Sequence, residues 1–441
     1  MASIEPRVLR GFRDYLSADM IPRREMVRDV ESVFDSYGYL PQMTPALEYS
    51  EILLGKYGDE GDSLLYRFRD NGDRDVALRY DLTVPLARVV GQHRDLPRPY
   101  RRYQIAPVWR AEKPARGRFR EFVQCDGDIV GSSDILADAE VLQLGADMLR
   151  KLGVKNFSIR INNRKVLSGL MEKIGVGQGS AELGVLRTID KLPKIGVDAT
   201  RKLLATENGL VEAQIASVFE FLGAGGDSPG LERVRGLFEA GSVGFQGCAE
   251  LEEVLAISRA AGLAECVEVD LSIARGLNYY TGTIYETFLS DLDGFGAVMS
   301  GGRYDGLIGV FSRQEIPGVG ISLGLDRLLA GLRELEVVEE RSGIAKVMVT
   351  VFDATTRQLS AQLARQIRLG GIDCELFPQV AKIGKQLSYA ERTGKRFAII
   401  AGPDEAEKGV VQVKNLAARA QEEVGVDRLQ ECLREKLSND D

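Results

Sequence analysis

The chain has 441 residues, with 57 Lys or Arg against 65 Asp or Glu, which gives a net charge of −8. This length is typical of two or three domains with cores of their own, and the acidic balance excludes a general nucleic-acid coat protein while it permits local basic patches. There is no apolar run of membrane-spanning length and no signal peptide pattern, so we expect a cytoplasmic protein without membrane association.

The cysteines and the single histidine limit the available chemistry. The cysteines are widely spaced: Cys125, Cys248, Cys266, Cys374 and Cys432. We therefore expect neither a zinc site nor a disulfide framework. His93 is the only histidine, which argues against a serine–histidine–aspartate triad and against a multi-histidine metal centre. The remaining candidates are carboxylates, arginines, backbone amides and a metal bound through hydroxyl or phosphate oxygens.

The N-terminal part predicts a helix and then an edge strand. Residues 22–37 carry apolar side chains at helical spacing, Pro22 suits a first turn, and Gly38 ends the pattern. Residues 39–45 look extended and contain two prolines, which favours an edge strand. A helix that closes on such a strand fits a dimer contact, and an ordinary capped sheet edge fits the pattern equally well.

Residues 64–70 and 75–80 predict two strands joined by the turn Asn71-Gly72. Asp81 and Thr83 follow, where a strand ends and a helix over residues 84–90 begins. One interpretation is helix capping, for which Thr83 is well placed. The other is a carboxylate and a hydroxyl directed at the ammonium group of a ligand.

The most informative stretch is residues 103–130. Two alternating runs flank a turn marked by Pro114 and Gly117, which predicts an antiparallel hairpin. Gln124, Asp126 and Asp128 alternate, so they face one side of a strand. Basic residues crowd the same region: Arg98, Arg101, Arg102, Arg110, Lys113, Arg116, Arg118 and Arg120. Guanidinium groups suit phosphate, although a solvated basic loop would give the same composition.

Residues 165–265 differ from their surroundings, since helical patterns alternate there with Gly-rich breaks and no chemical constellation is present. The helical patterns cover residues 166–174, 213–222, 231–239 and 248–261. We expect a helical insertion in a sheet domain. Sheet-like sequence resumes near residue 267, and Gly301-Gly302 before Arg303 and Tyr304 indicates a pocket wall or a structural turn. Residues 318–329 pass from strand to helix, with Arg327 in the first helical turn.

Residues 336–345 are charged and lack periodicity, which predicts a linker. Beyond it, strands at residues 346–352, 372–377, 396–401 and 410–414 are interspersed with helices at 355–369, 383–393 and 427–437. This order predicts βαβ units and a parallel sheet. No GxGxxG follows the first strand, so no dinucleotide site is expected.

Taken together, these motifs resemble those of the histidyl-tRNA synthetases, a family of class II aminoacyl-tRNA synthetases. The proline-ended segment at Pro45, residues 110–131 and residues 318–332 resemble class motifs 1, 2 and 3, while the histidyl assignment rests on residues 78–83, 275–282 and 300–305. The resemblance implies an α+β catalytic domain with a mixed, mainly antiparallel sheet, a helical insertion and a C-terminal α/β domain. It divides the chain into a catalytic core (1–164 and 266–335), a helical insertion (165–265) and an anticodon-binding domain (343–441).

The resemblance also implies site residues. Two arginines match catalytic positions: Arg110 and Arg275. Five residues match ATP-binding positions: Arg110, Glu112, Arg118, Phe122 and Arg327. Seven match histidine-binding positions: Asp81, Thr83, Gln124, Asp128, Arg275, Tyr280 and Tyr304. Among these, Asp81, Thr83 and Gln124 correspond to the family's ammonium-binding residues, and Asp128 and Tyr280 to those that read the imidazole.

The implied reaction has two steps, in which L-histidine reacts with ATP to form histidyl-adenylate and is then transferred to tRNA(His). We expect Mg²⁺ to accompany ATP, no zinc, and a cytoplasmic homodimer. One residue departs from the family, because Asn278 stands where Asp is usual.

Two alternative functions use the same residues differently. The first is a synthetase-like regulatory subunit of ATP phosphoribosyltransferase, a class that commonly lacks the anticodon-binding domain and the motif arginines. The second is a nucleic-acid-binding module without catalysis. The retained Arg110, Arg118, Arg275 and Arg327, together with the tail, favour the synthetase.

Overall fold

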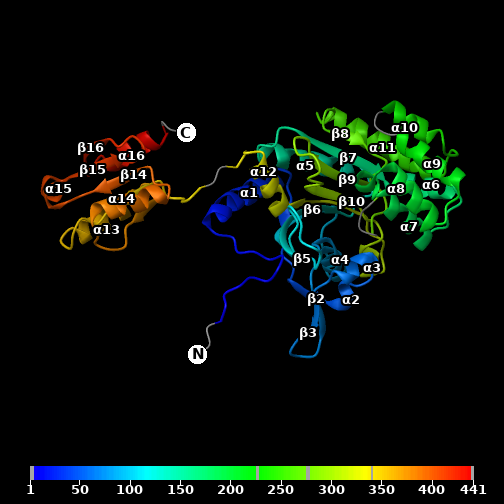
Figure 1. Cartoon of the computed structure of the whole chain (residues 1–441), viewed down its shortest axis with the longest axis horizontal. Coiled ribbons are helices and arrows are strands. Elements are labelled where there is room, and N and C mark those ends of the chain that lie inside the picture. The colour runs from blue at the N-terminus through cyan, green and yellow to red at the C-terminus, as the bar shows by residue number, and fades with distance from the viewer. Residues whose placement is uncertain (1–3, 225–227, 275–278, 339–340, 439–441) are drawn as a thin grey trace. The chain divides into compact units, whose positions relative to one another are not determined.

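The computed structural model describes residues 4–224, 228–274, 279–338 and 341–438. The chain divides into two compact units, one of residues 1–13 and 25–338 and the other of residues 14–24 and 339–441 (Figure 1). Within the described ranges, none of the helices combines the length and the apolar character needed to cross a membrane.

In the described residues, the first unit is built on an eight-stranded sheet with the order β1-β5-β6-β11-β10-β9-β7-β8. The strands are β1 (Leu40–Pro41), β5 (Tyr100–Trp109), β6 (Glu121–Val130), β7 (Phe157–Asn163), β8 (Val267–Val269), β9 (Thr283–Leu289), β10 (Met299–Arg303) and β11 (Gly318–Gly324). Neighbouring strands are antiparallel except at the two ends, where β1 and β5 and also β7 and β8 run parallel. The expected mixed, mainly antiparallel sheet is confirmed.

The predicted hairpin forms two adjacent strands of this sheet, next to the edge strand β1. Strands β5 and β6 pair in antiparallel register from Tyr100 opposite Val130 to Trp109 opposite Glu121. The connecting loop is closed by a bridge between Ala115 and Arg118, and Gly117 has a φ of 65°, a conformation that glycine adopts without strain. The turn expected at Pro114 and Gly117 is therefore confirmed.

The two faces of the sheet differ, because side chains alternate along each strand. The apolar face packs against helices α1 (Ser17–Ser36), α5 (Ile135–Lys151) and α12 (Leu325–Glu334). Contact is close there, since a Cβ on Gly127 would lie 2.4 Å from the Phe34 ring and 3.3 Å from Leu144. The opposite face carries a row of buried polar residues: Arg102, Gln104, Gln124, Asp126 and Asp128. Such groups need partners or a ligand.

Helix α1 begins earlier than expected, at Ser17, so that Pro22 lies inside the helix and not at its first position. Strand β1 is only Leu40–Pro41, and its single neighbour among the described strands is β5. The expected edge strand is thus present but much shorter than residues 39–45, as its two prolines favour.

A smaller sheet with the order β2-β4-β3 lies beside the central one (Figure 1). It contains β2 (Leu47–Tyr49), β3 (Arg67–Arg69) and β4 (Asp75–Leu78), with short helices α2 (Ser50–Leu53) and α3 (Gly58–Ser63) between β2 and β3. The predicted hairpin around Asn71-Gly72 is confirmed, since β3 and β4 are antiparallel. Helix α4 (Thr83–Gln92) follows, and the 3₁₀ turn η1 (Ile308–Val310) packs near it.

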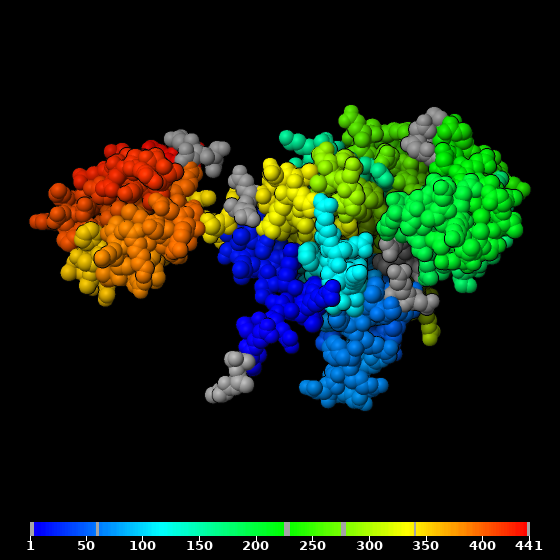
Figure 2. Space-filling view, viewed as in Figure 1, coloured from blue at the N-terminus to red at the C-terminus, as the bar shows by residue number. Residues whose placement is uncertain are grey.

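The segment between β7 and β8 is helical and forms one mass, green in Figure 2. Its helices are α6 (Arg164–Lys173), α7 (Ser180–Ile189), α8 (Leu192–Thr206), α9 (Glu212–Gly223), α10 (Ser228–Arg235) and α11 (Val243–Ala260). Sequence patterns missed α7 and α8, the second of which contains a kink at Gly196 with φ 81°. Helices α6 and α11 touch closely, since a Cβ on Gly169 would lie 2.4 Å from the Gly244 backbone. Their apolar residues share one core with the sheet.

The second unit contains a five-stranded sheet with the order β13-β12-β14-β15-β16 in the described residues. Its elements are β12 (Val347–Val349), α13 (Arg357–Leu369), β13 (Cys374–Leu376), α14 (Ile383–Arg392), β14 (Phe397–Ile400), α15 (Pro403–Lys408), β15 (Val410–Asn415), β16 (Gln421–Gly425) and α16 (Leu429–Ser438). Strands β13, β12 and β14 are parallel, whereas β15 and β16 are antiparallel, which corrects the fully parallel expectation. Residues 401–409 are too few for the crossover that a parallel β15 would need.

Candidate active site

Asp81 is a buried carboxylate between β4 and α4. Its Oδ1 accepts hydrogen bonds from the backbone N–H of Val84 (3.1 Å) and the hydroxyl of Tyr57 (3.0 Å), and its Oδ2 accepts one from the hydroxyl of Tyr279 (3.0 Å). Burial raises the pKa of Asp81, opposed by the Val84 N–H and the charge of Arg110. Asp81, and not Thr83, therefore supplies the side-chain acceptor at the start of α4.

Asp128 is held on β6 from two sides. Its Oδ1 accepts a hydrogen bond from the hydroxyl of Tyr304 at 2.5 Å, and Arg102 Nη2 lies 2.8 Å from its Oδ2 in a buried ion pair. The facing strand makes room, because a Cβ on Gly320 would lie 2.0 Å from Asp128 Oδ1 and one on Gly318 would lie 2.5 Å from the Tyr304 ring. The absence of side chains at these two positions of β11 permits the Tyr304–Asp128 contact.

Gln124 and Asp126 face Ser322 on the same side of the sheet. The Gln124 Nε2 donates a hydrogen bond to Ser322 Oγ at 2.6 Å, and Ser322 is the register partner of Asp126. Burial raises the pKa of Asp126 to about 7, with Asp128 acting in the same sense and Arg102 and Ser322 lowering it. These two carboxyls, two residues apart on β6, thus share Arg102 as a neighbouring cation.

Acceptors on this face lack donors. On this face, within the part of the chain that the structure describes, three buried side-chain oxygens of β6 accept no hydrogen bond: Gln124 Oε1, Asp126 Oδ1 and Asp128 Oδ2. Asp128 Oδ2 lies 2.8 Å from Arg102 Nη2, so its charge is compensated by an ion pair although it accepts no hydrogen bond. Buried acceptors without donors are unfavourable by about 1–3 kcal/mol each. A ligand with N–H donors and a positive charge would satisfy them.

The two candidate tyrosines differ in their surroundings. The hydroxyl of Tyr280 makes no hydrogen bond to any residue of the described ranges, while that of Tyr304 is bound to Asp128. Burial and then the charges of Asp81, Asp126 and Asp128 raise the pKa of Tyr280, so it carries a proton that it can donate. The Tyr304 hydroxyl is thus engaged with Asp128 in the structure.

Arg303 is structural. Its guanidinium is buried, forms an ion pair with Asp138 of α5, and donates to the carbonyl oxygens of Ser132 and Asp134. Gly301 is also structural, since a Cβ there would lie 2.1 Å from the Gly320 carbonyl oxygen. Both residues lie in strand β10, so the expected structural turn is not present at these positions.

Arg110 and Phe122 form the start of a second, more open area. Arg110 Nε donates to the carbonyl oxygen of Tyr80 at 3.1 Å, and its guanidinium carbon lies 4.4 Å from the centre of the Tyr80 ring and 5.1 Å from that of Phe122. Phe122 stands opposite Val108 in the hairpin and packs on a small core of Leu82, Ala106 and Val108. A flat aromatic surface thus lies beside a guanidinium.

Arg327 contributes a second cation to this area. It begins the first turn of α12, donates to the carbonyl oxygen of Phe295, and is approached by Gly117, where a Cβ would lie 3.1 Å from its Cγ. Burial and the nearby charge of Arg118 lower the pKa of Arg327, while Glu112 raises it. Arg118 Nη1 is 3.5 Å from Glu112 Oε2. Cations held together in this way favour a polyanionic ligand.

Other members of the basic cluster have structural partners. Arg101 pairs with Glu140 of α5, Arg116 with Glu334 of α12, and Arg120 donates to the carbonyl oxygens of Glu112 and Arg10. The cluster therefore separates into arginines that hold the hairpin and arginines that are available to a ligand.

The described residues among those predicted group into two areas of the first unit, one on the polar face of the sheet and one around the hairpin loop and the start of α12. We call the first the amino-acid side (Asp81, Thr83, Gln124, Asp128, Tyr280, Tyr304) and the second the nucleotide side (Arg110, Glu112, Arg118, Phe122, Arg327). Arg275 and Asn278 lie outside the described residues. Sequence reasoning assigned no ligand role to five polar residues of the amino-acid side: Tyr57, Arg102, Asp126, Tyr279 and Ser322. Alternation along β6 placed Asp126 beside Gln124 and Asp128 and was the available signal.

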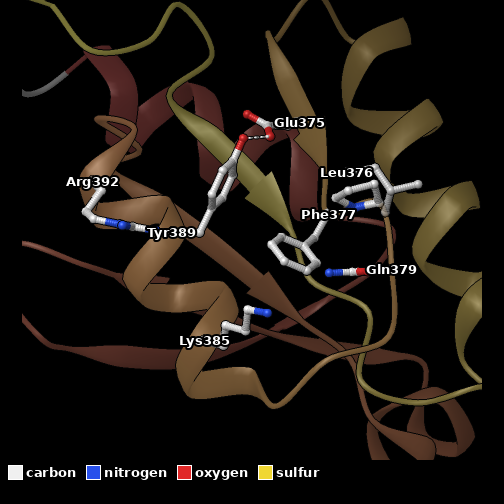
Figure 3. Close-up of a pocket in the computed structure, with 8 residues that line it drawn as sticks. Glu375, Leu376, Phe377, Gln379, Lys385, Tyr389 and Arg392 are labelled. Atoms are coloured by element: carbon white, nitrogen blue, oxygen red, sulfur yellow. Dashed lines mark hydrogen bonds between the residues drawn. The ribbon is translucent and has the colours of Figure 1, made fainter. Parts of the chain in front are cut away.

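The second unit has a pocket of about 410 Å³ between the end of β13 and α14 (Figure 3). Its lining residues are Glu375, Leu376, Phe377, Pro378, Gln379, Lys385, Tyr389 and Arg392. Tyr389 donates to Glu375 Oε1 at 2.6 Å, and its ring meets that of Phe377 edge to face at 5.5 Å. Lys385 and Arg392 lie on α14, on the same wall as Tyr389. The pocket combines aromatic surface with positive charge.

Comparisons with known proteins agree with this arrangement. Residues 11–328 match the histidyl-tRNA synthetase family, and residues 346–436 match the anticodon binding domain family. A histidine–tRNA ligase of Rhodopirellula baltica is 45% identical over 427 residues, 96% of each chain, and one of Wolinella succinogenes is 41% identical over 425 residues, 94% of this chain and 95% of that one. The crystal structure of histidyl-tRNA synthetase from Nostoc sp. PCC 7120 is 31% identical, covers 98% of this chain and 100% of its own, and has a TM-score of 0.87.

The class II arrangement expected from the motifs is confirmed by these matches, which extend across both units. With its two-unit organisation, its arginine-bearing hairpin and its buried polar face, the chain belongs to the histidyl-tRNA synthetase family.

Proposed function

We propose that this chain is a histidine–tRNA ligase that activates L-histidine with ATP and transfers it to the 3′ end of tRNA(His). The observation that carries the proposal is the set of unpartnered, buried acceptors on β6, immediately beside the cations of the nucleotide side. An amino acid with an ammonium group and a ring N–H satisfies the first, and a triphosphate satisfies the second.

The ammonium group of histidine is placed between Asp81 and Gln124. Asp81 is held by Tyr57, Tyr279 and the Val84 N–H, so its position is set before a ligand binds. Gln124 Oε1 adds a neutral acceptor, and Thr83 adds a hydroxyl at the start of α4. Prearranged acceptors reduce the conformational entropy that is lost on binding.

The imidazole is placed between Asp128 and Tyr280. A neutral imidazole has one N–H and one bare nitrogen. Asp128 Oδ2 accepts the N–H, while the Tyr280 hydroxyl, which bonds to no described residue, donates to the bare nitrogen. Tyr304 and Arg102 hold Asp128 in position. A side chain that cannot satisfy both groups leaves them buried and unpaired, which is the basis of strong discrimination.

The nucleotide side receives ATP. The adenine ring stacks on Phe122, and Arg118 and Arg327 bind phosphate oxygens, with Glu112 beside them. Arg110 lies beside the rings of Tyr80 and Phe122. From there it stabilises the charge that develops on the α-phosphate during in-line attack by the histidine carboxylate. The family resemblance assigns a second catalytic arginine to Arg275, which lies outside the described residues.

Mg²⁺ enters with ATP. Magnesium prefers oxygen ligands and is usually held by substrate phosphates with one or two carboxylates. In the described residues no group of three or more His, Cys, Asp or Glu side chains forms a metal site. The negative charges of Glu112 and Glu286 act on Arg327, so these two carboxylates lie near the cations that we assign to the phosphates. The ion would supply further charge neutralisation there.

The tRNA contacts the second unit, and we assign the Phe377–Tyr389 pocket to one unstacked base of the anticodon loop. A base stacks on aromatic rings and a phosphate pairs with cations, and both are offered here by Tyr389, Lys385 and Arg392. Arg392→Ala should weaken tRNA charging without an effect on histidine-dependent pyrophosphate exchange. Arg365→Ala, an exposed arginine on α13, is the matched control.

The chain is proposed to form a homodimer through the edge near β1. Several apolar side chains are exposed there: Leu40, Met43, Leu47, Tyr49 and Phe68. A two-fold contact buries the same patch on both subunits. Light scattering on the protein, whose chain mass is 48.4 kDa, should show a dimer, and Met43→Glu should dissociate it, whereas Val310→Glu, at another exposed apolar residue, should not.

Histidine-dependent exchange of pyrophosphate with ATP tests the first step, and charging of tRNA(His) tests the second. Removal of residues 343–441 should leave exchange largely intact and abolish charging, because the proposed ATP and histidine contacts lie in the first unit, which has its own core. Absence of histidine-dependent exchange in the full chain would favour the regulatory-subunit alternative.

A further inference from the structure

Ser322 connects two polar side chains of β6. Its Oγ accepts a hydrogen bond from Gln124 Nε2 at 2.6 Å. Asp126 is its direct partner in the register of β6 and β11, and the hydrogen bond between Ser322 and Asp126 lowers the pKa of that carboxyl against the effect of burial. The Ser322 hydroxyl therefore interacts with both the Asp126 carboxyl and the Gln124 amide.

The number of hydrogens determines which group donates. A serine hydroxyl has one hydrogen and two lone pairs, and an ionised carboxylate only accepts. When Asp126 is ionised, the hydrogen of Ser322 goes to it, and the Ser322 lone pairs face Gln124. Gln124 can then approach Ser322 only with its NH₂ group. Its oxygen, Oε1, is left as the end available to a ligand, and among the described residues it has no donor.

We propose that Asp126 and Ser322 are positioning residues for the amino acid, which orient the Gln124 amide so that its oxygen meets the ammonium group. This rests on the proposed function, in which Gln124 contacts that group. The two ends of an amide have almost the same shape, so an unconstrained Gln124 can turn over and present its NH₂ group, which an ammonium repels. The pair acts through Gln124 and needs no contact with histidine.

A purely structural role explains the pair less well. Strands β6 and β11 are already joined by an antiparallel ladder from Gly318 to Gly324, so the sheet does not need this contact. The ionised form of Asp126 is also disfavoured, because burial and the charges of Asp128 and Asp81 raise its pKa. Arg102 favours the ionised form, and the ammonium group of bound histidine adds to that effect.

The test is a set of variants measured in pyrophosphate exchange, with the Michaelis constants for histidine and ATP determined separately. Asp126→Asn should raise the KM for histidine about 10- to 100-fold, because the new amide donates to Ser322 and the serine hydrogen then turns to Gln124. Ser322→Ala should raise it about 3- to 10-fold, since Gln124 is then unconstrained and not inverted. The KM for ATP should change less than about 2-fold in both. Ser158→Ala, which removes a serine that donates to Glu268 at 2.6 Å on the far side of the same sheet, should change neither.

A compensating double variant separates orientation from structure. In Asp126→Asn with Gln124→Glu, the net charge is unchanged, the amide donates to Ser322, and Ser322 donates to the new carboxylate, which still offers an oxygen to the ammonium. The KM for histidine should return to within about 5-fold of the wild type. Calorimetric titration of L-histidine into each variant without ATP should rank the variants by dissociation constant as the KM for histidine ranks them.

Unchanged histidine constants in Asp126→Asn and Ser322→Ala would overturn the proposal, as would a double variant that is worse than Asp126→Asn alone. A wild-type protein that binds histidine but shows no histidine-dependent pyrophosphate exchange would instead overturn the proposed function. The dissociation constants of the variants for histidine would still decide the role of Asp126 and Ser322.

Discussion

The amino-acid side and the nucleotide side of the candidate site are built by different means. On the amino-acid side the carboxylates of Asp81, Asp126 and Asp128 are almost fully buried, and hydroxyl groups, a backbone N–H or Arg102 hold them. On the nucleotide side Arg118 keeps 39% of its side-chain surface exposed, and its Nη1 lies 3.5 Å from Glu112 Oε2, which is long for an ion pair. Burial supports selection of a small ligand, while open cations suit a large, charged one.

This difference corresponds to two separate requirements of the reaction, which are discrimination between amino acids and stabilisation of the charge on the reacting phosphate. Discrimination requires buried polar groups that only one ligand satisfies. Stabilisation of a developing charge requires cations near the reacting phosphate, with freedom to close around it. Changes on the nucleotide side should therefore affect the rate, and changes on the amino-acid side should affect the affinity for histidine.

The largest expected effect is on the nucleotide side. Arg110→Ala should reduce the rate of pyrophosphate exchange by about two to three orders of magnitude, the scale for loss of a charge-stabilising group. Calorimetric binding of histidine alone should stay within about 2-fold, since Arg110 contacts Tyr80 and Phe122 and not the β6 acceptors. Arg116→Ala, in the same hairpin but paired with Glu334, is the control. A large loss of histidine affinity in Arg110→Ala would show that the two sides are not separate.

Sequence patterns placed the residues of the nucleotide side near one another more readily, because four of the five lie in one hairpin. Arg110, Glu112, Arg118 and Phe122 are close in sequence, and the turn between the strands was evident from Pro114 and Gly117. Only Arg327 comes from a distant segment.

The amino-acid side depends on strand order. Alternation predicted that Gln124, Asp126 and Asp128 share a face, but β11 pairs with β6 across a long interval of sequence, so Ser322 and Gly320 could not be assigned as neighbours. Strand direction in the second unit was mispredicted for a related reason. The antiparallel direction of β15 is set by the short connection from β14, and the residue pattern of β15 itself does not indicate it.

The second prediction concerns the shape of the amino-acid side. Gly320→Ala adds a Cβ at 2.0 Å from Asp128 Oδ1, so the carboxylate must move. We expect the KM for histidine to rise about 10- to 100-fold, the result of about 1–3 kcal/mol of overpacking, with little change in the KM for ATP. Gly177→Ala, at a glycine with open space around it, should be neutral. An equal rise in both constants would indicate general damage to the sheet.

The third prediction separates the two tyrosines. Tyr280→Phe removes a hydroxyl that bonds to no described residue, so it should raise the KM for histidine about 5- to 10-fold without lowering the melting temperature. Tyr304→Phe removes the donor to Asp128 Oδ1, so it should both raise that constant and lower the melting temperature. If Tyr280→Phe destabilised the protein and left histidine kinetics normal, Tyr280 would be a packing residue.

The smallest expected effect is on stability and depends on pH. The pKa of Asp126 is raised from 3.8 to about 7 by burial, so the folded protein keeps a proton that the unfolded chain has lost over that interval. The stabilising contribution of this protonated carboxyl is complete below pH 3.8 and is lost as the pH rises through about 7. Asp126→Asn cannot ionise, so its melting temperature relative to the wild type should increase from pH 5 to pH 7 and then level off. The slope is about 1.4 kcal/mol per pH unit at most, or a few degrees over the interval. Asp81 and Asp128 are present in both proteins, so the difference between the two curves reports Asp126 together with its coupling to these two carboxyls. A constant difference across the range would show that Asp126 is already ionised in the folded protein at pH 5. Burial on the amino-acid side would then have no measurable effect on the ionisation of this carboxyl, which would remove one energetic difference between the two sides.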